Sequence, residues 1–237
     1  MVTKQITLAI DSSSQTLSAA LLKGENVVIE AHTDTCIHHT VSIISFVESI
    51  LKASGVLLQE VDLFSIITGP GSFTGLRVGI STVKGFAYAY DKPVAAVSSL
   101  FALAHNIEGS TMPICVMIDA KQSMVYAALY QTLRSGVMTA VTDELAVKPA
   151  EFLSTLSGDI LFLGNGVRMH ASLIKENYDI TAHYTRVEYD RIQAGIVGLI
   201  GLKKFNDGDI VNTMTLAPRY LRSSYAEVND VVRSGRI

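Results

Sequence analysis

The chain has 237 residues, of which 49% are hydrophobic and 17% charged, so it can fill one large core or two smaller ones. Its net charge of −3 argues against a protein that binds nucleic acid by itself, because such proteins carry a basic excess that neutralises phosphates. The two cysteines form no CxxC pair, and the N-terminal apolar run is too short for a signal peptide. The apolar stretch at 194–202 is far short of the ~20 residues that span a bilayer. We therefore expect a cytoplasmic chain with no membrane segment.

Three short apolar segments open the chain and predict strands. They cover residues 6–10, 16–22 and 27–32, and clusters of Asp, Ser, Gly and Asn separate them. Short strands joined by such turns are typical of an antiparallel meander. The first half is therefore expected to begin with three antiparallel strands.

The apolar spacing then changes to that of a helix. Apolar residues between Ile43 and Leu51 recur at helical spacing, which predicts a helix over 39–54 that ends before Gly55. A buried strand at 63–68, a second helix at 73–90 and a strand at 94–97 are expected next.

The second half repeats this order in outline. The expected elements are strands at 113–119, 124–130 and 137–141, a helix at 149–156, a strand at 160–163 and a last helix at 190–205. This echo predicts two related α/β subdomains. We place the boundaries at 1–105 for the N-terminal lobe, 106–215 for the C-terminal lobe and 216–237 for a tail.

A glycine-rich segment, GPGSFTGLRVG at 69–79, lies between a predicted strand and a predicted helix. Such a loop can hold a phosphate on backbone N–H groups, but its spacing matches neither the Walker loop, nor the dinucleotide fingerprint, nor the nucleophile elbow. The preferred interpretation is structural. Ser72 caps the helix, while Gly75 and Gly79 lie on one face and permit close helix approach, which also suits a helix–helix interface between two chains.

Asp11 and the serines Ser12, Ser13 and Ser14 form a polar turn after the first strand. Actin-like ATPases carry an Asp in a comparable turn, close to metal-bound phosphates, with a glycine that admits them. Here serines occupy the turn, so we interpret Asp11 as a carboxylate that stabilises the turn, and these four residues as at most a vestigial nucleotide site.

A cluster of Cys36, His38 and His39 precedes the first predicted helix. Metal-binding histidines on a helix prefer i and i+4, and this spacing is not met. We expect no metal site and no catalytic residues.

The motifs together resemble the TsaB (YeaZ) family. The family's GPGSFTGLRxG hallmark is matched without a gap at 69–79. Further matches are Lys84-Gly85, Pro93, the segment 97–100 with Leu103-Ala104, the segment 118–120 with Val125-Tyr126, and the segment 218–222. Lys121 and Met124 depart from the family pattern, which often has arginine and glutamate at those positions.

The resemblance implies an α/β fold of two actin-like (ASKHA) lobes, each a mixed five-stranded-type sheet with flanking helices. It also implies a non-catalytic scaffold or activating subunit. In the family, TsaD transfers threonylcarbamoyl from threonylcarbamoyl-AMP to the adenosine adjacent to the anticodon of tRNA, which makes threonylcarbamoyladenosine (t6A). The implied partners are TsaD in a heterodimer, TsaE in a ternary complex, tRNA through the complex, and a second copy of the chain when it is alone. ATP is used by the complex, and no cofactor is implied for this chain.

The resemblance places the partner interface on the two helices at 39–54 and 73–90. The residues expected there are Val41, Ile44, Val47, Glu48, Leu51, Gly75, Arg77, Gly79, Val83 and Phe86. Two alternatives stay open: an actin-like ATPase or small-molecule kinase, and, less favoured, a metallopeptidase of the glycoprotease type.

Overall fold

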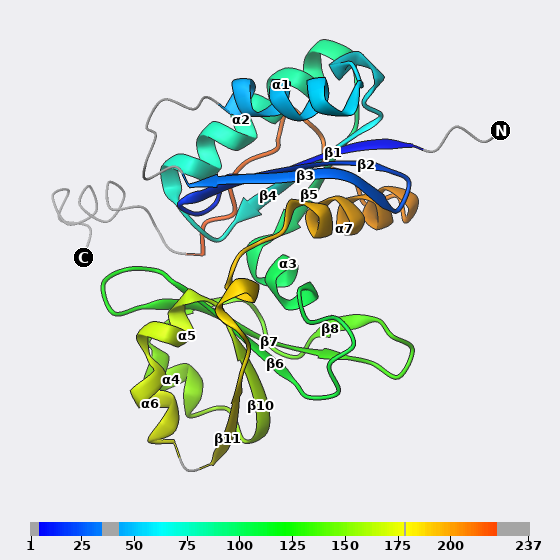
Figure 1. Ribbon diagram of the computed structural model, residues 1–237. Helices are drawn as coiled ribbons and strands as arrows, with labels where there is room; N and C mark the ends of the chain where they lie inside the picture. Colours follow the sequence, from blue (N-terminus) through cyan, green and yellow to red (C-terminus); the bar gives the residue numbers. More distant parts are fainter. Residues whose placement is uncertain (1–4, 35–42, 178, 222–237) are drawn as a thin grey trace, which may run out of the picture.

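The protein folds as two α/β lobes, each built on its own sheet. The computed structural model describes residues 5–34, 43–177 and 179–221. Figure 1 shows the first sheet above the second, with the chain passing from one to the other and back. Within the described residues, none of the helices is both long and apolar enough to cross a membrane.

The first sheet is mixed and has the order β3-β2-β1-β4-β5. β1 pairs antiparallel with β2, and β2 with β3, whereas β4 lies parallel to β1 and β5 parallel to β4. The bounds confirm the predicted strands closely: β1 Ile6–Asp11, β2 Thr16–Lys23, β3 Asn26–Asp34, β4 Leu63–Gly69 and β5 Val94–Ser98.

Two helices cover one face of this sheet. α1 (Ile43–Ser54) joins β3 to β4, and α2 (Phe73–Tyr90) joins β4 to β5, where the helical spacing predicted them. Because side chains alternate along a strand, Leu8 and Ile10 of β1 point into the core beneath these helices. Figure 1 shows α1 and α2 on the same side of the sheet, which leaves their outer faces available for contacts.

The second sheet repeats the topology of the first. Its strand order is β11-β10-β6-β7-β8, which corresponds to the order of the first sheet when it is read from β8 to β11. β6, β7 and β8 are antiparallel neighbours, and β10 and β11 are parallel to β6. A further strand, β9, pairs with β7. The bounds are β6 Ile114–Asp119, β7 Val125–Thr132, β8 Met138–Ala140, β9 Leu145–Val147, β10 Gly158–Leu163 and β11 Ile180–Tyr184. The predicted echo between the two halves is therefore confirmed.

Three short helices belong to the second lobe. They are α4 (Pro149–Leu153), α5 (Asn165–Met169) and α6 (Ala171–Lys175), and they flank one face of the second sheet. The core on this face contains Phe152, Phe162 and Ile174. α3 (Ser99–His105), α5, α6, β9 and β11 were not predicted from the sequence. Two 3₁₀ turns cover Leu58–Glu60 and Val187–Asp190.

The expected lobe boundaries need a correction, because each sheet is followed by a helix that packs toward the other sheet. α3 (Ser99–His105) follows β5 and contacts β6 and β7, while α7 (Ala194–Asn206) follows β11 and lies on the first sheet. On α7, glycines allow the close approach: a Cβ on Gly201 would lie 2.2 Å from the Ser65 hydroxyl oxygen. The chain then stays with the first lobe, where Leu216 enters the core, so residues 216–221 are not a free tail.

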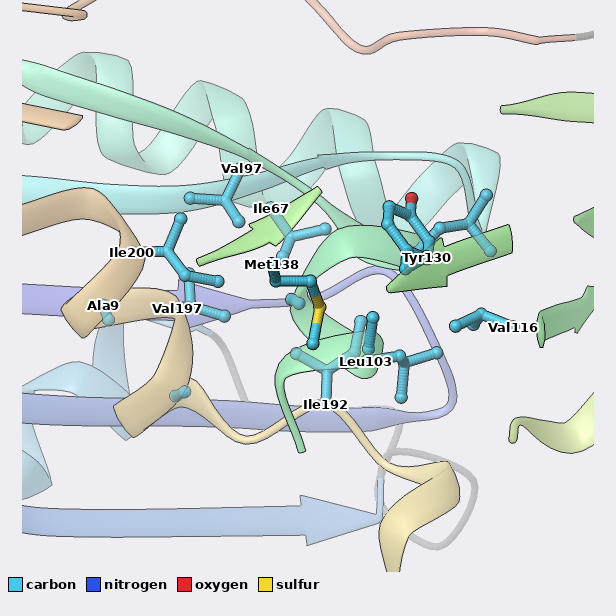
Figure 2. Close-up of a cluster of buried hydrophobic side chains, with 14 of the residues drawn as sticks. Ala9, Ile67, Val97, Leu103, Val116, Tyr130, Met138, Ile192, Val197 and Ile200 are labelled. Carbon is cyan, nitrogen blue, oxygen red and sulfur yellow. The ribbon is translucent and has the colours of Figure 1, made fainter. Parts of the chain in front are cut away.

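A continuous apolar cluster joins the two lobes. It contains Ala9 and Val97 of the first sheet, Val197 of α7, Leu103 of α3 and Tyr130 of the second sheet, all almost completely buried. Figure 2 shows these side chains converging from both sheets. The lobes therefore share a core, which fixes the second sheet beneath the first.

Candidate functional site

The glycine-rich segment packs against the Asp11–Ser14 turn of the same chain. The Ser12 hydroxyl donates to the carbonyl oxygen of Gly75 over 2.9 Å, and the Ser72 N–H donates to the carbonyl oxygen of Ser13 over 2.7 Å. Ser72 also caps α2 as predicted, accepting from the Gly75 N–H at 3.2 Å. The turn and the helix N-terminus thus form one interlocked unit.

The glycines of this segment are needed for that contact. A Cβ on Gly75 would lie 2.0 Å from the carbonyl oxygen of Ser12, and a Cβ on Gly79 would lie 2.0 Å from the Ser12 hydroxyl oxygen. A close helix approach was predicted here, whereas the approaching element is the chain's own turn. Gly79 is buried and is removed from the expected interface between chains, while Gly75 is partly exposed and its place there stays a prediction.

Asp11 lies inside this unit. Its Oδ1 accepts from the Ser13 N–H at 2.8 Å, and the carboxyl group is buried. Burial raises its pKa from 3.8 to about 6, with the Ser13 hydrogen bonds opposing the shift. The next serine, Ser14, exchanges hydrogen bonds with the backbone of Thr16. The geometry fits the interpretation of Asp11 as a turn-stabilising carboxylate.

The contact between the two loops has a chemical consequence. Backbone atoms of Ser12 and Ser13 occupy the space beside Gly71 and Gly75 so closely that even a methyl group does not fit. A phosphate group is larger than a methyl group. At Gly71 and Gly75 the turn itself therefore fills the space beside the glycine-rich segment, and no bound group fits at these two positions.

The helix residues expected at an interface separate into two groups. Val47, Leu51 and Val83 are buried in the core beneath α1 and α2, so these three are removed from the expected interface: their side chains face the sheet of the same chain. Phe86 is half-buried, with its ring centroid 6.0 Å from that of Phe64. Val41 lies outside the described residues.

Three of the residues expected at the interface lie on the exposed faces of the same helices. Ile44 and Glu48 are exposed on α1, and Arg77 is exposed on α2. On α2 the structure adds exposed apolar side chains that were not predicted at the interface: Phe73, Val78, Tyr88 and Tyr90.

An aromatic and arginine cluster marks the N-terminal end of α2. The rings of Phe73 and Tyr220 stack with centroids 5.2 Å apart, and the Arg77 guanidinium lies 3.8 Å from the centroid of the Phe73 ring. Arg77 Nε also donates to the Tyr220 hydroxyl over 2.9 Å. Both rings are about 41% exposed. The sequence could not predict this cluster, because Tyr220 and Arg77 are 143 positions apart.

Metal-ligating side chains do not gather in the described part of the chain, where no group of three His, Cys, Asp or Glu residues could hold an ion. The cluster of Cys36, His38 and His39 lies outside the described residues. Cys115 is buried in the second lobe, and burial raises the pKa of its thiol.

Two lobes of the same strand order, sharing a core and flanked by helices, define a protein of the actin-like (ASKHA) fold. A solved ROK hexokinase from Thermus thermophilus shares this fold, with a TM-score of 0.50 at 9% identity over 86% of this chain and 100% of that chain. The likeness shows the fold alone.

Closer relatives identify the family. The chain is 31% identical over 226 residues to the "tRNA threonylcarbamoyladenosine biosynthesis protein TsaB" of Bacillus subtilis (strain 168), covering 93% of this chain and 95% of the relative. The solved structure of YeaZ from Pseudomonas aeruginosa superposes with a TM-score of 0.78 at 27% identity, over 92% of this chain and 100% of that chain. Residues 33–229 match the family model of TsaD, described as tRNA N6-adenosine threonylcarbamoyltransferase. The chain belongs to the TsaB (YeaZ) family.

Proposed function

We propose that the chain acts in the synthesis of t6A on tRNA as a non-catalytic subunit that holds TsaD in a competent state. The relatives' names supply the pathway. The observation that carries the non-catalytic role is the contact of Ser12 and Ser13 with Gly71 and Gly75, which fills the place where the two loops could have held a phosphate. This chain is then a binding surface that carries no cofactor of its own, and the complex uses ATP.

The proposed partner surface is the exposed face of α1 and α2. Ile44 and Val78 are each 49% exposed, and Glu48 and Arg77 lie beside them on the same helices. An apolar centre with charged neighbours is the composition of a protein–protein interface. We assign this surface to TsaD in the complex and to a second copy when the chain is alone.

TsaE and tRNA are assigned to the complex as a whole. With a net charge of −3, the chain itself lacks the basic excess that neutralises many phosphates, so other subunits supply most of the contacts to tRNA.

Depletion of the protein in its native cell tests this function. Digested tRNA is analysed for t6A by mass spectrometry, and the cells are complemented with the intact chain, with the double variant Ile44→Asp plus Val78→Asp, or with Val137→Asp. Val137 is a matched control because it is 44% exposed in the second lobe. We expect t6A to disappear on depletion, to return with the intact chain and the control, and not to return with the double variant.

Each part of the proposal can be contradicted by a specific experimental result. Unchanged t6A after verified depletion, in a cell with no second copy of the gene, would overturn the pathway. Full rescue by the double variant would overturn the placement of the interface. Nucleotide hydrolysis by the isolated chain, lost in Asp11→Asn, would favour the actin-like enzyme instead.

A further inference from the structure

A segment that follows α7 runs back along α2 and carries the last described residues. We name residues 212–220 the C-terminal strap. Lys84 of α2 donates from Nζ to the carbonyl oxygens of Met214 at 3.0 Å and Leu216 at 3.2 Å. Leu216 itself is buried in the core beneath α1 and α2. The strap is therefore fixed to the helix that carries the proposed partner surface.

The far end of the strap meets the second lobe at Glu144. This residue lies between β8 and β9, and its side chain is only 9% exposed. Its Oε1 accepts from the Tyr130 hydroxyl at 2.8 Å and from the Ser98 hydroxyl, while its Oε2 accepts from Arg219 Nη1 at 2.8 Å. Donors from both sheets and from the strap thus converge on one carboxylate.

Such a carboxylate holds its donors firmly. A largely buried carboxylate that loses a charged donor is left with an uncompensated charge, which is strongly unfavourable. Tyr130 is anchored in the core that joins the lobes (Figure 2), so Glu144 has a fixed position on the second lobe. Arg219 is 52% exposed and belongs to a segment without helix or strand, so its side chain depends on Glu144 for its position.

Arg219 in turn places Tyr220. The Arg219 N–H donates to the carbonyl oxygen of Thr68 at 2.7 Å, and a Cβ on Gly69 would lie 2.8 Å from the Arg219 carbonyl oxygen, so the strap backbone lies directly against the end of β4. The next side chain, Tyr220, stacks on Phe73 and accepts from Arg77. Any displacement of Arg219 must move Tyr220 with it.

We infer that Glu144 is a positioning residue for the α2 surface: by holding Arg219, it keeps Tyr220 in the cluster with Phe73 and Arg77. The N-terminal end of α2 is then a composite surface, with two residues from the helix and one from the strap. A change in the second lobe that moves Glu144 is transmitted to this surface. The part of the inference that concerns partner binding rests on the proposed function, whereas the link from Glu144 to Tyr220 does not.

A single fluorophore tests the link. The chain has no tryptophan, so Tyr220→Trp introduces one reporter that keeps the ring stack but not the hydroxyl. Into this background we would place Arg219→Met, Glu144→Gln, or the control Asp209→Asn, which removes an exposed ion pair with Lys204 on the same part of the chain. Arg219→Met is the primary variant because its side chain is half exposed, so the fold should tolerate it.

The expected result is a red-shifted emission and a rise of about twofold in acrylamide quenching for Arg219→Met and Glu144→Gln, without change for Asp209→Asn, because the strap end opens locally. The two changes combined should have no larger effect on the reporter than either alone, since both remove the ion pair between Glu144 and Arg219. Unchanged emission and quenching in folded Arg219→Met would overturn the link.

Partner binding is then measured separately by titrating the Arg219→Met variant, with Tyr220 intact, against purified TsaD. We expect its affinity to fall several-fold, while Asp209→Asn binds as the unmodified chain does. Altered quenching with unchanged affinity would overturn the composite partner surface and leave the link intact. Loss of affinity for Ile44→Asp plus Val78→Asp, measured in parallel, tests the proposed function itself, so the two failures are distinguishable.

Discussion

Ser12 and Gly75 lie 63 residues apart, yet the hydroxyl of the first donates to the carbonyl oxygen of the second over 2.9 Å. The same glycine has no space for a side chain, because the Ser12 carbonyl oxygen occupies the position of a Cβ. This contact accounts for the hydroxyl at Ser12 and for the absence of a side chain at Gly75.

Gly75→Ala should therefore destabilise the protein strongly. The methyl group would meet backbone atoms, which cannot rotate away, and overpacking of this kind costs about 3 kcal/mol. Gly85→Ala is the matched control on the same helix: nothing lies within 4 Å of its Cβ position, so it should raise the free energy of unfolding by about 0.5–1 kcal/mol. Urea unfolding of both variants measures the difference. Equal effects would contradict the tight contact at Gly75.

Asp11 predicts a pH dependence of stability. Its pKa in the folded protein is about 6, above the value of 3.8 for a free side chain, so the folded state binds the proton more tightly than the unfolded state. The stability that this proton contributes is fully present below pH 3.8 and is lost as the pH rises through 6. The loss amounts to ~3 kcal/mol at most.

Asp11→Asn isolates this effect, because asparagine keeps an oxygen for the Ser13 N–H and does not titrate in this range. Unfolding free energies measured from pH 4 to 7 should diverge, with the variant gaining relative to the unmodified chain above pH 5. Parallel curves would contradict the raised pKa. In cells, the variant should still restore t6A if the chain is non-catalytic.

Asp190 holds the second lobe together near its last strand. Its Oδ2 accepts from Arg168 Nε at 2.7 Å, and its Oδ1 accepts from the Gly164 N–H at 2.7 Å, with the Asp190 side chain largely buried. Asp190→Asn should lower the free energy of unfolding by about 2 kcal/mol, since hydrogen bonds to charged groups are the stronger ones. Asp209→Asn breaks an exposed ion pair with Lys204 and should cost less than about 1 kcal/mol. Thermal unfolding compares the two; equal losses would contradict a special role for Asp190.

The order of elements from β1 to β5 could be predicted from the sequence because its signals are local. Strands 6–11 and 16–23 are bounded by turn residues, and α2 has eighteen residues, enough for several turns of helical spacing. Five-residue helices such as α5 and α6 give less than two turns, so their spacing carries little signal.

The site was harder to predict, because its contacts join distant parts of the chain. Arg219 meets Glu144 across 75 positions, and Ser12 meets Gly75 across 63, with no local pattern to indicate either pair. The helix faces were a different problem: an apolar residue such as Val83 suits both a core and an interface, and only the sheet beneath α2 decides between them.

Val83 and Val78 therefore make the sharpest pair of substitutions on α2. Val83 is completely buried, so Val83→Asp places an unpaired charge in the core and should prevent stable folding, with a loss of several kcal/mol. Val78 is half exposed, so Val78→Asp should change the free energy of unfolding by less than about 0.5 kcal/mol. Circular dichroism during heating distinguishes these outcomes before any binding is measured.

Only the folded variant then reports on the partner surface. Sedimentation of Val78→Asp alone and with TsaD should show weaker self-association and weaker heterodimer formation than Val137→Asp, the exposed control in the second lobe. The reason is that a charge would be buried without a partner at the apolar centre of the interface. Identical sedimentation of the two variants would move the interface away from Val78, whereas loss of pairing by Val83→Asp alone would reflect only the loss of its fold.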